Sequence, residues 1–138
     1  MLVEEIHSVV VATVDETGHP HTAVMDMMWE DGKTVYFLTA DFKPLYKRLK
    51  EDGRVALTGM TQGAGTMDRK SISLTGQVEW IGKEHLEELL KANPYMYEIY
   101  PTEEGRSHLQ VFRFKNAVGN FYDLTQLPPY QARFEIEG

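Results

Sequence analysis

The sequence predicts a mainly β protein, a small antiparallel barrel of about six strands with two helices inserted between them. Short runs of β-branched and apolar residues recur along the chain and are separated by turn residues. Only two stretches, 44–51 and 83–92, have their apolar residues at helical spacing. Most joints between strands are too short for the crossover helices of a parallel sheet, so the strands are expected to pair antiparallel.

The composition is that of an ordinary folded protein of 138 residues, and we expect a single domain over 1–138. The absence of cysteine excludes disulfides, thiolate metal sites and thiol nucleophiles, and it agrees with a cytoplasmic location. A formal net charge of -7 argues against general nucleic-acid binding. The acidic residues at 4–5 do not resemble a signal peptide, and no apolar run approaches the roughly 20 residues that span a membrane, so no membrane association is expected.

The first third of the chain reads as three strands. Residues 7–14 are apolar and β-branched, and a turn cluster at 15–20 separates them from a second strand at 21–29. The Asp-Gly pair at 31–32 marks a hairpin before a third strand at 33–38. We expect a meander in which each of these strands pairs with the one before it.

A basic amphipathic helix is predicted at 44–51. Pro44 suits a first helical position, because the backbone N–H at that position has no partner within the helix and proline loses nothing by lacking it. Leu45 and Leu49 form the stripe expected to be buried. Gly53 is interpreted as a left-handed residue that closes the helix.

The rest of the chain continues the pattern of strands and one further helix. Strands are predicted at 54–60 and 71–81, the latter with a bulge or bend at Gly76, and a flexible loop joins them. The helix at 83–92 precedes a short aromatic element. The last strands are predicted at 109–115 and 118–124, and the tail from 127 to 138 can add an edge strand.

The turn between the third strand and the basic helix is the strongest functional signal. Lys43, Lys47, Arg48 and Lys50 bring four of the fourteen Lys and Arg residues into eight positions of an acidic chain. Thr39 at the strand exit and Lys43 at the helix cap can both reach one phosphate, which the positive end of the helix dipole also favours. The competing interpretation is a helix whose cations face water.

The second strand and the entry of the fifth carry weaker signals. Strand alternation places Met25, Met27 and Trp29 on one face and Val24, Asp26 and Met28 on the other. A carboxylate such as Asp26 in an apolar strand must be solvated or paired, and the strand could also lie along a flat aromatic ring. Lys70 and Ser71 offer a second cation and hydroxyl for the same anion, or simply form a solvated strand end. The five histidines show no metal-binding spacing.

In their order these segments resemble the pyridoxamine 5′-phosphate oxidase-like, FMN-binding split-barrel family. The likeness extends from about residue 9 to residue 124. The best-matching segments are 9–15 with 18–20, 35–39, 54–57 and 72–76.

Members of that family usually form homodimers that hold two FMN molecules at the subunit interface. The resemblance implies that the strand around 24–28 lines the isoalloxazine ring, and that Thr39 and Lys43 hold the ribityl phosphate. It places Lys70 and Ser71 among further polar contacts, and Tyr122 near a tryptophan of the oxidase that reaches the flavin. The cofactor-binding residues so predicted are Val24, Met25, Asp26, Met27, Leu38, Thr39, Lys43, Lys70, Ser71 and Tyr122.

The chain also departs from the oxidase pattern. Pro44 and Leu45 stand where the oxidase has an arginine and a lysine, and Ala23 and Met28 replace two cations of its second strand. The oxidase's C-terminal substrate motif of arginine and histidine has no counterpart in 121–138. We therefore expect a relative of the oxidase, an FMN-dependent oxidoreductase with another substrate. The alternatives are a non-catalytic flavin-binding or sensor module, and a split barrel that uses a deazaflavin or heme.

Overall fold

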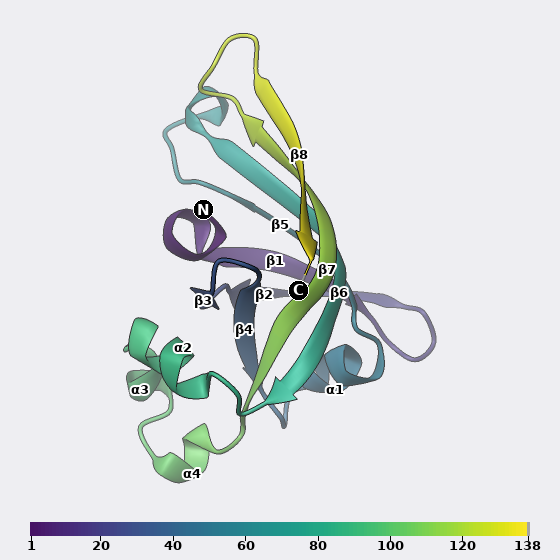
Figure 1. The fold of residues 1–138 in the computed structure, drawn as a ribbon, viewed down its shortest axis with the longest axis vertical. Helices are drawn as coiled ribbons and strands as arrows, with labels where there is room; N and C mark the ends of the chain where they lie inside the picture. Colours follow the sequence, from purple (N-terminus) through teal and green to yellow (C-terminus); the bar gives the residue numbers. More distant parts are fainter. Residues whose placement is uncertain (138) are drawn as a thin grey trace.

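The computed structural model describes residues 1–137, and its main feature is one curved antiparallel sheet of eight strands (Figure 1). The strands are β1 (Ser8–Val14), β2 (Pro20–Asp26), β3 (Trp29–Glu30), β4 (Val35–Ala40), β5 (Arg54–Met60), β6 (Lys70–Gly82), β7 (Leu109–Asp123) and β8 (Tyr130–Glu137). The helices are α1 (Pro44–Glu51), α2 (Leu86–Ala92), α3 (Met96–Ile99) and α4 (Glu103–Arg106), with a π-helical turn η1 (Leu2–Ile6) and a 3₁₀ turn η2 (Thr66–Asp68). The predicted class, mainly antiparallel β with inserted helices, is confirmed.

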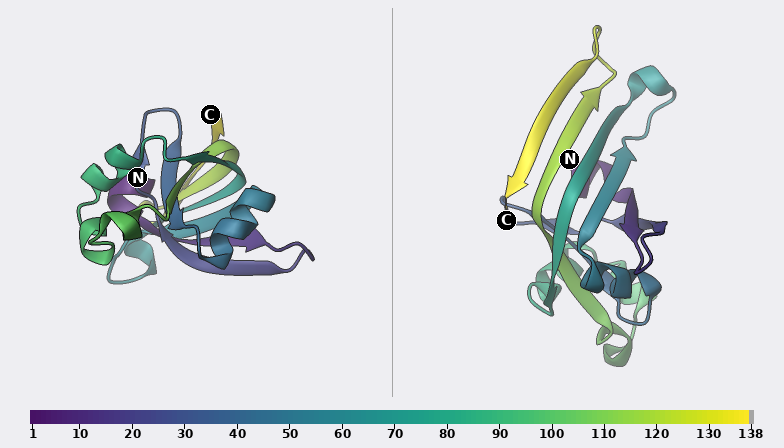
Figure 2. Two further views of the ribbon diagram at one scale, coloured as in Figure 1. Left: turned by 90° about the horizontal axis from the view of Figure 1, so that it is seen from below. Right: turned by 90° about the vertical axis from the view of Figure 1, so that its right-hand side faces the viewer.

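Strand β7 organises the sheet, whose order is β2-β1-β5-β6-β7-β4-β3. One edge of β7 pairs with β6 along most of its length. The other edge is shared, because β4 pairs with the first part of β7 and β8 pairs with the remainder. The second half of β7, together with the first half of β6 and with β8, extends beyond the barrel as a curved arm (Figure 2).

The predicted three-stranded meander is wrong in its second pairing. Strands β1 and β2 pair as expected, but β4 pairs with β3 and β7 instead of β2. After Asp26 the chain leaves β2 through two buried methionines, and the N–H of Met28 donates to the carbonyl of Tyr36 at 2.9 Å. The Asp-Gly hairpin therefore joins the two-residue β3 to β4, with Gly32 at φ 87°.

The two strands predicted at 109–115 and 118–124 form one continuous strand, β7. The irregularity expected near Gly76 is present as a register shift between Gln77 and Val78 of β6. A Cβ on Gly76 would lie 2.1 Å from the carbonyl oxygen of Asn116, so the close approach of β6 to β7 requires glycine here. The C-terminal tail does add an edge strand, β8, and Gly138 lies outside the described residues.

Helix α1 has the predicted bounds, and Leu45 and Leu49 are buried as expected. Its C-terminal end is different from the prediction, because the chain leaves through Asp52 in an extended conformation and Gly53 is not left-handed. Glycine is needed at 53 for another reason: a Cβ there would lie 2.5 Å from the carbonyl oxygen of Val78. The segment that follows α1 therefore packs closely against β6 at Gly53, and the expected left-handed cap does not form.

The second predicted helix is shorter than expected and is followed by two further helical turns. It begins at Leu86 because His85, at φ 63°, interrupts the helical backbone just before it. Helices α2, α3 and α4 form a group at one end of the sheet, away from the arm (Figure 1). No helix within residues 1–137 is both long and apolar enough to cross a membrane.

Two clusters of buried side chains lie on opposite faces of β4. The barrel cluster, which includes Phe37 and Phe112, fills the space enclosed by the curved sheet and α1. Their rings stack with centroids 5.7 Å apart. The helix cluster, which includes Leu38 and Leu89, lies under α2 and α3. Because successive side chains of a strand point to opposite faces, β4 is buried along its whole length and contributes to both clusters.

Candidate functional site

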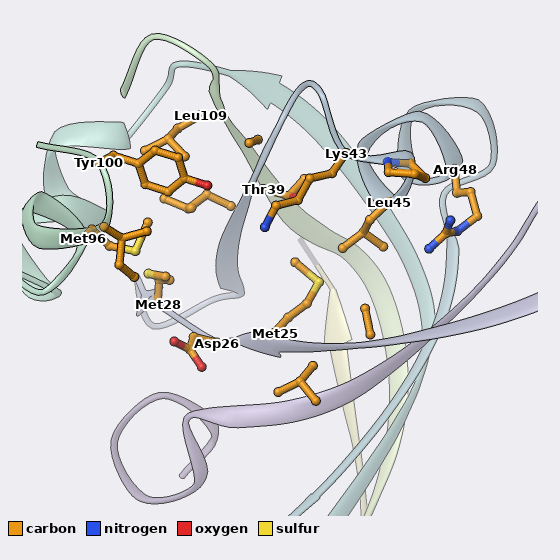
Figure 3. Close-up of a pocket in the computed structure, with 16 residues that line it drawn as sticks. Met25, Asp26, Met28, Thr39, Lys43, Leu45, Arg48, Met96, Tyr100 and Leu109 are labelled. Atoms are coloured by element: carbon orange, nitrogen blue, oxygen red, sulfur yellow. The ribbon is translucent and has the colours of Figure 1, made fainter. Parts of the chain in front are cut away.

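A hollow of about 440 Å³ lies where β2, β4, α1, the start of β7 and the α3 segment meet. We call it the central pocket, and Figure 3 shows its lining. The lining residues are Ala23, Val24, Met25, Asp26, Met28, Leu38, Thr39, Ala40, Lys43, Pro44, Leu45, Arg48, Met96, Ile99, Tyr100 and Leu109. Its size falls within the range of small-molecule and cofactor sites, roughly 300–1,000 Å³.

One side of the central pocket is basic. Thr39 is buried at the end of β4, Lys43 stands just before α1, and Arg48 lies one turn further along that helix. Figure 3 shows the Lys43 side chain reaching past Thr39 toward the middle of the pocket. The Arg48 Nε donates to Thr13 Oγ1 at 2.8 Å, which fixes the guanidinium at the pocket wall. Two cations and a hydroxyl therefore line the same pocket, and such groups favour an anion.

The start of α1 offers fewer backbone donors than the sequence suggested. Lys43 occupies the N-cap position and has an extended backbone. Pro44 has no N–H, and the N–H of Tyr46 donates to the Lys43 carbonyl at 3.1 Å. An anion on this side would therefore be held more by side-chain charge than by free N–H groups of the helix end.

The middle of the pocket is apolar and rich in thioethers. Met25, Met28 and Met96 are each buried, and Leu38 and Leu109 complete this part of the wall. Methionine side chains adapt their shape and make favourable contacts with aromatic rings. A flat, apolar ring system can therefore pack here while its polar end reaches the basic side.

A single carboxylate, Asp26, lies at the edge opposite Arg48 (Figure 3). Ser8 Oγ donates to Asp26 Oδ1 at 2.6 Å, and the Tyr95 hydroxyl donates to Oδ2 at 2.8 Å. His7 Nε2 lies 3.4 Å from the same Oδ2. Burial acts to raise the pKa of Asp26, but the hydrogen bonds from Ser8 and Tyr95 and the charge of His7 outweigh it and lower the pKa below its ordinary value.

Six of the ten residues predicted to bind a cofactor line the central pocket. They are Val24, Met25, Asp26, Leu38, Thr39 and Lys43. Met27 does not, because it is fully buried in the barrel cluster. The alternation expected along the second strand ends at Asp26, where β2 stops.

The other three predicted residues lie away from this pocket, on the arm. Lys70 and Ser71 begin β6, and Ser71 pairs with Tyr122 near the end of β7. Strand β7 starts at the pocket with Leu109 and reaches Tyr122 only thirteen positions later. Within one chain the structure therefore does not bring these three side chains together with Thr39 and Lys43.

Several residues of the site were not expected from the sequence. Arg48 was not among the predicted cofactor-binding residues, yet it lines the pocket because Thr13 of β1 holds its guanidinium there. Met96, Ile99 and Tyr100 come from the aromatic-rich segment after α2, whose density in tyrosine was the one available signal.

One protein family matches most of this chain. The sequence model of the family described as pyridoxamine 5'-phosphate oxidase matches residues 1–122. The chain therefore belongs to this family, in agreement with the resemblance found in its sequence. Among curated proteins none matches.

Solved structures show the same fold at low sequence identity. A NimC/NimA family protein from Clostridium acetobutylicum has a TM-score of 0.79 and 21% identity, over 97% of this chain and 87% of that one. A heme binding protein from Mycobacterium smegmatis has a TM-score of 0.72 and 13% identity, over 96% of this chain but only 54% of that one. An F420 reductase has a TM-score of 0.63 and 20% identity, over 82% and 88% of the two chains. The fold is thus shared by proteins with different cofactors in their names.

Proposed function

We propose that the chain is an FMN-dependent oxidoreductase that holds FMN in the central pocket. The observation that carries the proposal is the division of one pocket into a basic side, with Thr39, Lys43 and Arg48, and an apolar side rich in methionine. The phosphate of FMN fits the first and its ring system fits the second. Bound there, FMN would supply hydride or electron transfer, and the protein would supply its position and electrostatics.

The proposal includes a homodimer with FMN at the interface. Lys70, Ser71 and Tyr122 lie on the arm, so they can contribute to a flavin site only if the arm of a second copy approaches the pocket. Val24 supports this arrangement, because it lines the pocket yet leaves 72% of its surface exposed. The molar mass in solution, from light scattering, tests it, and a monomer at micromolar concentration with FMN bound would contradict it.

The chemistry of the pocket also ranks the alternative cofactors by how well each suits the residues that line it. A deazaflavin such as F420 carries a phosphate and a flat ring system and so meets the same two requirements. Heme is a poorer fit, because no histidine is among the residues that line the pocket in the described part of the chain. A cytoplasmic location belongs to the proposal as well, since a chain without cysteine suits a reducing compartment.

A ligand comparison tests the proposed function. Purified protein is titrated with FMN, with riboflavin, with F420 and with heme, and absorption spectra and quenching of flavin fluorescence give the affinities. We expect FMN to bind at least about tenfold more tightly than riboflavin, because riboflavin lacks the phosphate that the basic side recognises. Equal affinity for the two flavins would overturn the phosphate assignment, and binding of F420 or heme alone would replace FMN.

A reduction experiment separates an enzyme from a sensor. The FMN-loaded protein is mixed with NADH or NADPH without oxygen, and bleaching of the flavin absorbance is followed. Multiple turnovers with a second electron acceptor support the oxidoreductase. Bound FMN that neither accepts electrons nor passes them on favours the non-catalytic module.

A further inference from the structure

Three polar side chains from distant parts of the sequence form a continuous hydrogen-bonded chain that ends at the central pocket. His7 follows η1, Tyr95 precedes α3, and Asp26 ends β2. His7 Nε2 lies 2.8 Å from the Tyr95 hydroxyl, which lies 2.8 Å from Asp26 Oδ2. The side chains of His7 and Asp26 are each 29% exposed, and Asp26 also lines the pocket. When a ligand in the pocket covers the Asp26 end, His7 is left as the end of the chain that contacts solvent.

The hydrogen-bonding capacities of these groups determine how many protons they share. His7 Nδ1 lies 3.1 Å from the carbonyl oxygen of Val3, which only accepts, so this nitrogen carries a proton. Tyr95 has one hydroxyl proton for two neighbours. If His7 Nε2 and both Asp26 oxygens lacked protons, one of the two contacts of Tyr95 would have no donor. One additional proton is therefore needed to complete the chain.

That proton has two fully hydrogen-bonded positions. In the first, His7 is doubly protonated and donates to Tyr95, which donates to the Asp26 carboxylate. In the second, His7 is neutral, Asp26 is protonated and donates to Tyr95, and Tyr95 donates to His7. The two arrangements differ only by the shift of two protons along the chain.

The backbone at His7 is held in an uncommon conformation that keeps this ring in place. Its φ of 61° is unfavourable for a residue other than glycine. The N–H of His7 donates to the Leu2 carbonyl and its carbonyl accepts from Met27 N–H, both at 2.7 Å. Such backbone strain concentrates at functional sites. It supports a role for His7 beyond packing.

We propose that His7, Tyr95 and Asp26 form a proton relay from solvent to the central pocket, with Asp26 as the group that exchanges protons with a bound redox ligand or its substrate. The proposal rests on the proposed function, because the ligand is one that gains or loses a proton when it is reduced or oxidised. Asp26 is then the catalytic residue, while Tyr95 and His7 act through it as positioning and conducting residues.

Proton delivery along the relay is balanced. The His7 Nε2–H bond breaks as a new O–H bond forms on Tyr95, and the original Tyr95 O–H bond breaks as one forms on Asp26. Asp26 then gives its proton to the ligand and returns to the carboxylate, and His7 regains a proton from water. No electrons move in these steps. The titratable groups that act on Asp26 are His7 and Tyr95, with Ser8 as its other hydrogen-bond donor.

The first test uses the protein without any ligand. Nitrogen-15 NMR of the histidine rings reports whether His7 carries one or two ring protons. We expect the Nε2 signal of His7 to differ between the parent chain and Tyr95→Phe, which keeps the aromatic packing against His7 but removes the hydroxyl that contacts Nε2. Tyr97→Phe is the matched control, because Tyr97 lies outside the pocket lining and the relay and should leave His7 unchanged. A His7 ring that is indifferent to Tyr95→Phe would overturn the relay.

The second test uses the FMN-loaded protein. It is reduced with dithionite without oxygen and then mixed with dioxygen, and reoxidation is timed in H₂O and in D₂O. We expect Tyr95→Phe to be about 100-fold slower, the lower end of what acid–base groups contribute, and to lose the solvent isotope effect, while Tyr97→Phe matches the parent. The affinity for FMN should be the same in all three.

These tests distinguish a failure of the proton relay from a failure of the proposed function. Parent-like rates and isotope effects in a folded Tyr95→Phe that binds FMN would overturn the relay and leave the FMN site intact. Loss of FMN binding in the parent would overturn the proposed function, whereas the NMR result would still decide whether the three residues share a mobile proton.

Discussion

The two polar sides of the central pocket satisfy their charges in different ways. On the basic side, neither Lys43 nor Arg48 forms an ion pair with any residue that the structure describes. On the acidic side, Asp26 already accepts hydrogen bonds from Ser8 and Tyr95 and lies near His7. The basic side is therefore open to a ligand, whereas the acidic side is largely satisfied by the protein itself.

This difference separates binding from chemistry. Unpaired cations at a pocket wall gain a partner when an anion arrives, so they contribute mainly to affinity. A carboxylate held by several donors has a fixed position and a lowered pKa, so it contributes to fold stability and, in the proposed relay, to proton transfer. Substitutions on the two sides should therefore change different measurements.

The largest effect is expected from removing both cations of the basic side. Lys43→Ala combined with Arg48→Ala should weaken FMN binding about 100-fold, because each charge-assisted contact is worth about 1.5 kcal/mol. Equilibrium titration of flavin fluorescence measures this. The control, Lys47→Ala with Lys91→Ala, removes the same charge from exposed positions. A similar loss in that control would show that overall charge, not the pocket, attracts the phosphate.

The next effect should appear on the acidic side, and in stability. Tyr95→Phe should lower the free energy of unfolding by about 1.5 kcal/mol, because a partly buried carboxylate loses a donor. Its affinity for FMN should remain within about twofold of the parent. Urea denaturation and flavin titration give the two values. A variant that loses FMN affinity but keeps its stability would contradict the assignment of binding to the basic side and of stability to the acidic side.

A smaller effect is expected on the free energy of unfolding at acidic pH. The pKa of Asp26 is lowered from its ordinary value of 3.8 in the folded chain, so the ionised group stabilises the fold above that pH and loses its contribution as pH falls below it. The difference in unfolding free energy between the parent and Asp26→Asn should therefore be largest near neutral pH and shrink below pH 3.8. Urea denaturation across this pH range measures the difference. A gap that widens in acid would mean that burial, not hydrogen bonding, controls Asp26.

Salt should produce the smallest effect and distinguish the sides once more. Raising the ionic strength from about 0.05 to 0.5 M should weaken FMN binding several-fold, since exposed charges are screened over a few ångströms at high salt. The stability difference between the parent and Tyr95→Phe should change by less than about 0.3 kcal/mol, because those partners are in direct contact. Salt-independent FMN binding would argue against a phosphate on the basic side.

The basic side could be predicted from the sequence because its parts are neighbours in the chain. Thr39, Lys43 and the start of α1 lie within a few residues of one another, and local rules place a helix after Pro44. Arg48 could not be placed in the same way. Its side chain faces the pocket because of Thr13, and no pattern within α1 reports where β1 will lie.

The acidic side and the strand pairing depend on contacts between distant segments. Asp26 stood out as a carboxylate in an apolar strand, which correctly required a partner. Its partner Tyr95 lies 69 positions away and shows no spacing signal, so the relay is visible only in the folded chain. The pairing of β4 with β7 was missed for the same reason, whereas the fold class depended on local alternation and was correct. The single domain over 1–138, the dimer and the cofactor remain predictions.

The pairing of β4 with β7 has a consequence for how the protein folds during synthesis. Leu38 in one wall of the pocket pairs with Val111, so β4 leaves the ribosome long before its partner exists. Contacts between such distant segments form slowly, because a long loop must close first. Until β7 arrives, the apolar faces of β4 lack their cover, and the nascent chain is at its most prone to aggregation. The pocket is thus expected to be among the last parts of the molecule to form, too late for a cofactor to assist the folding of the strands before it.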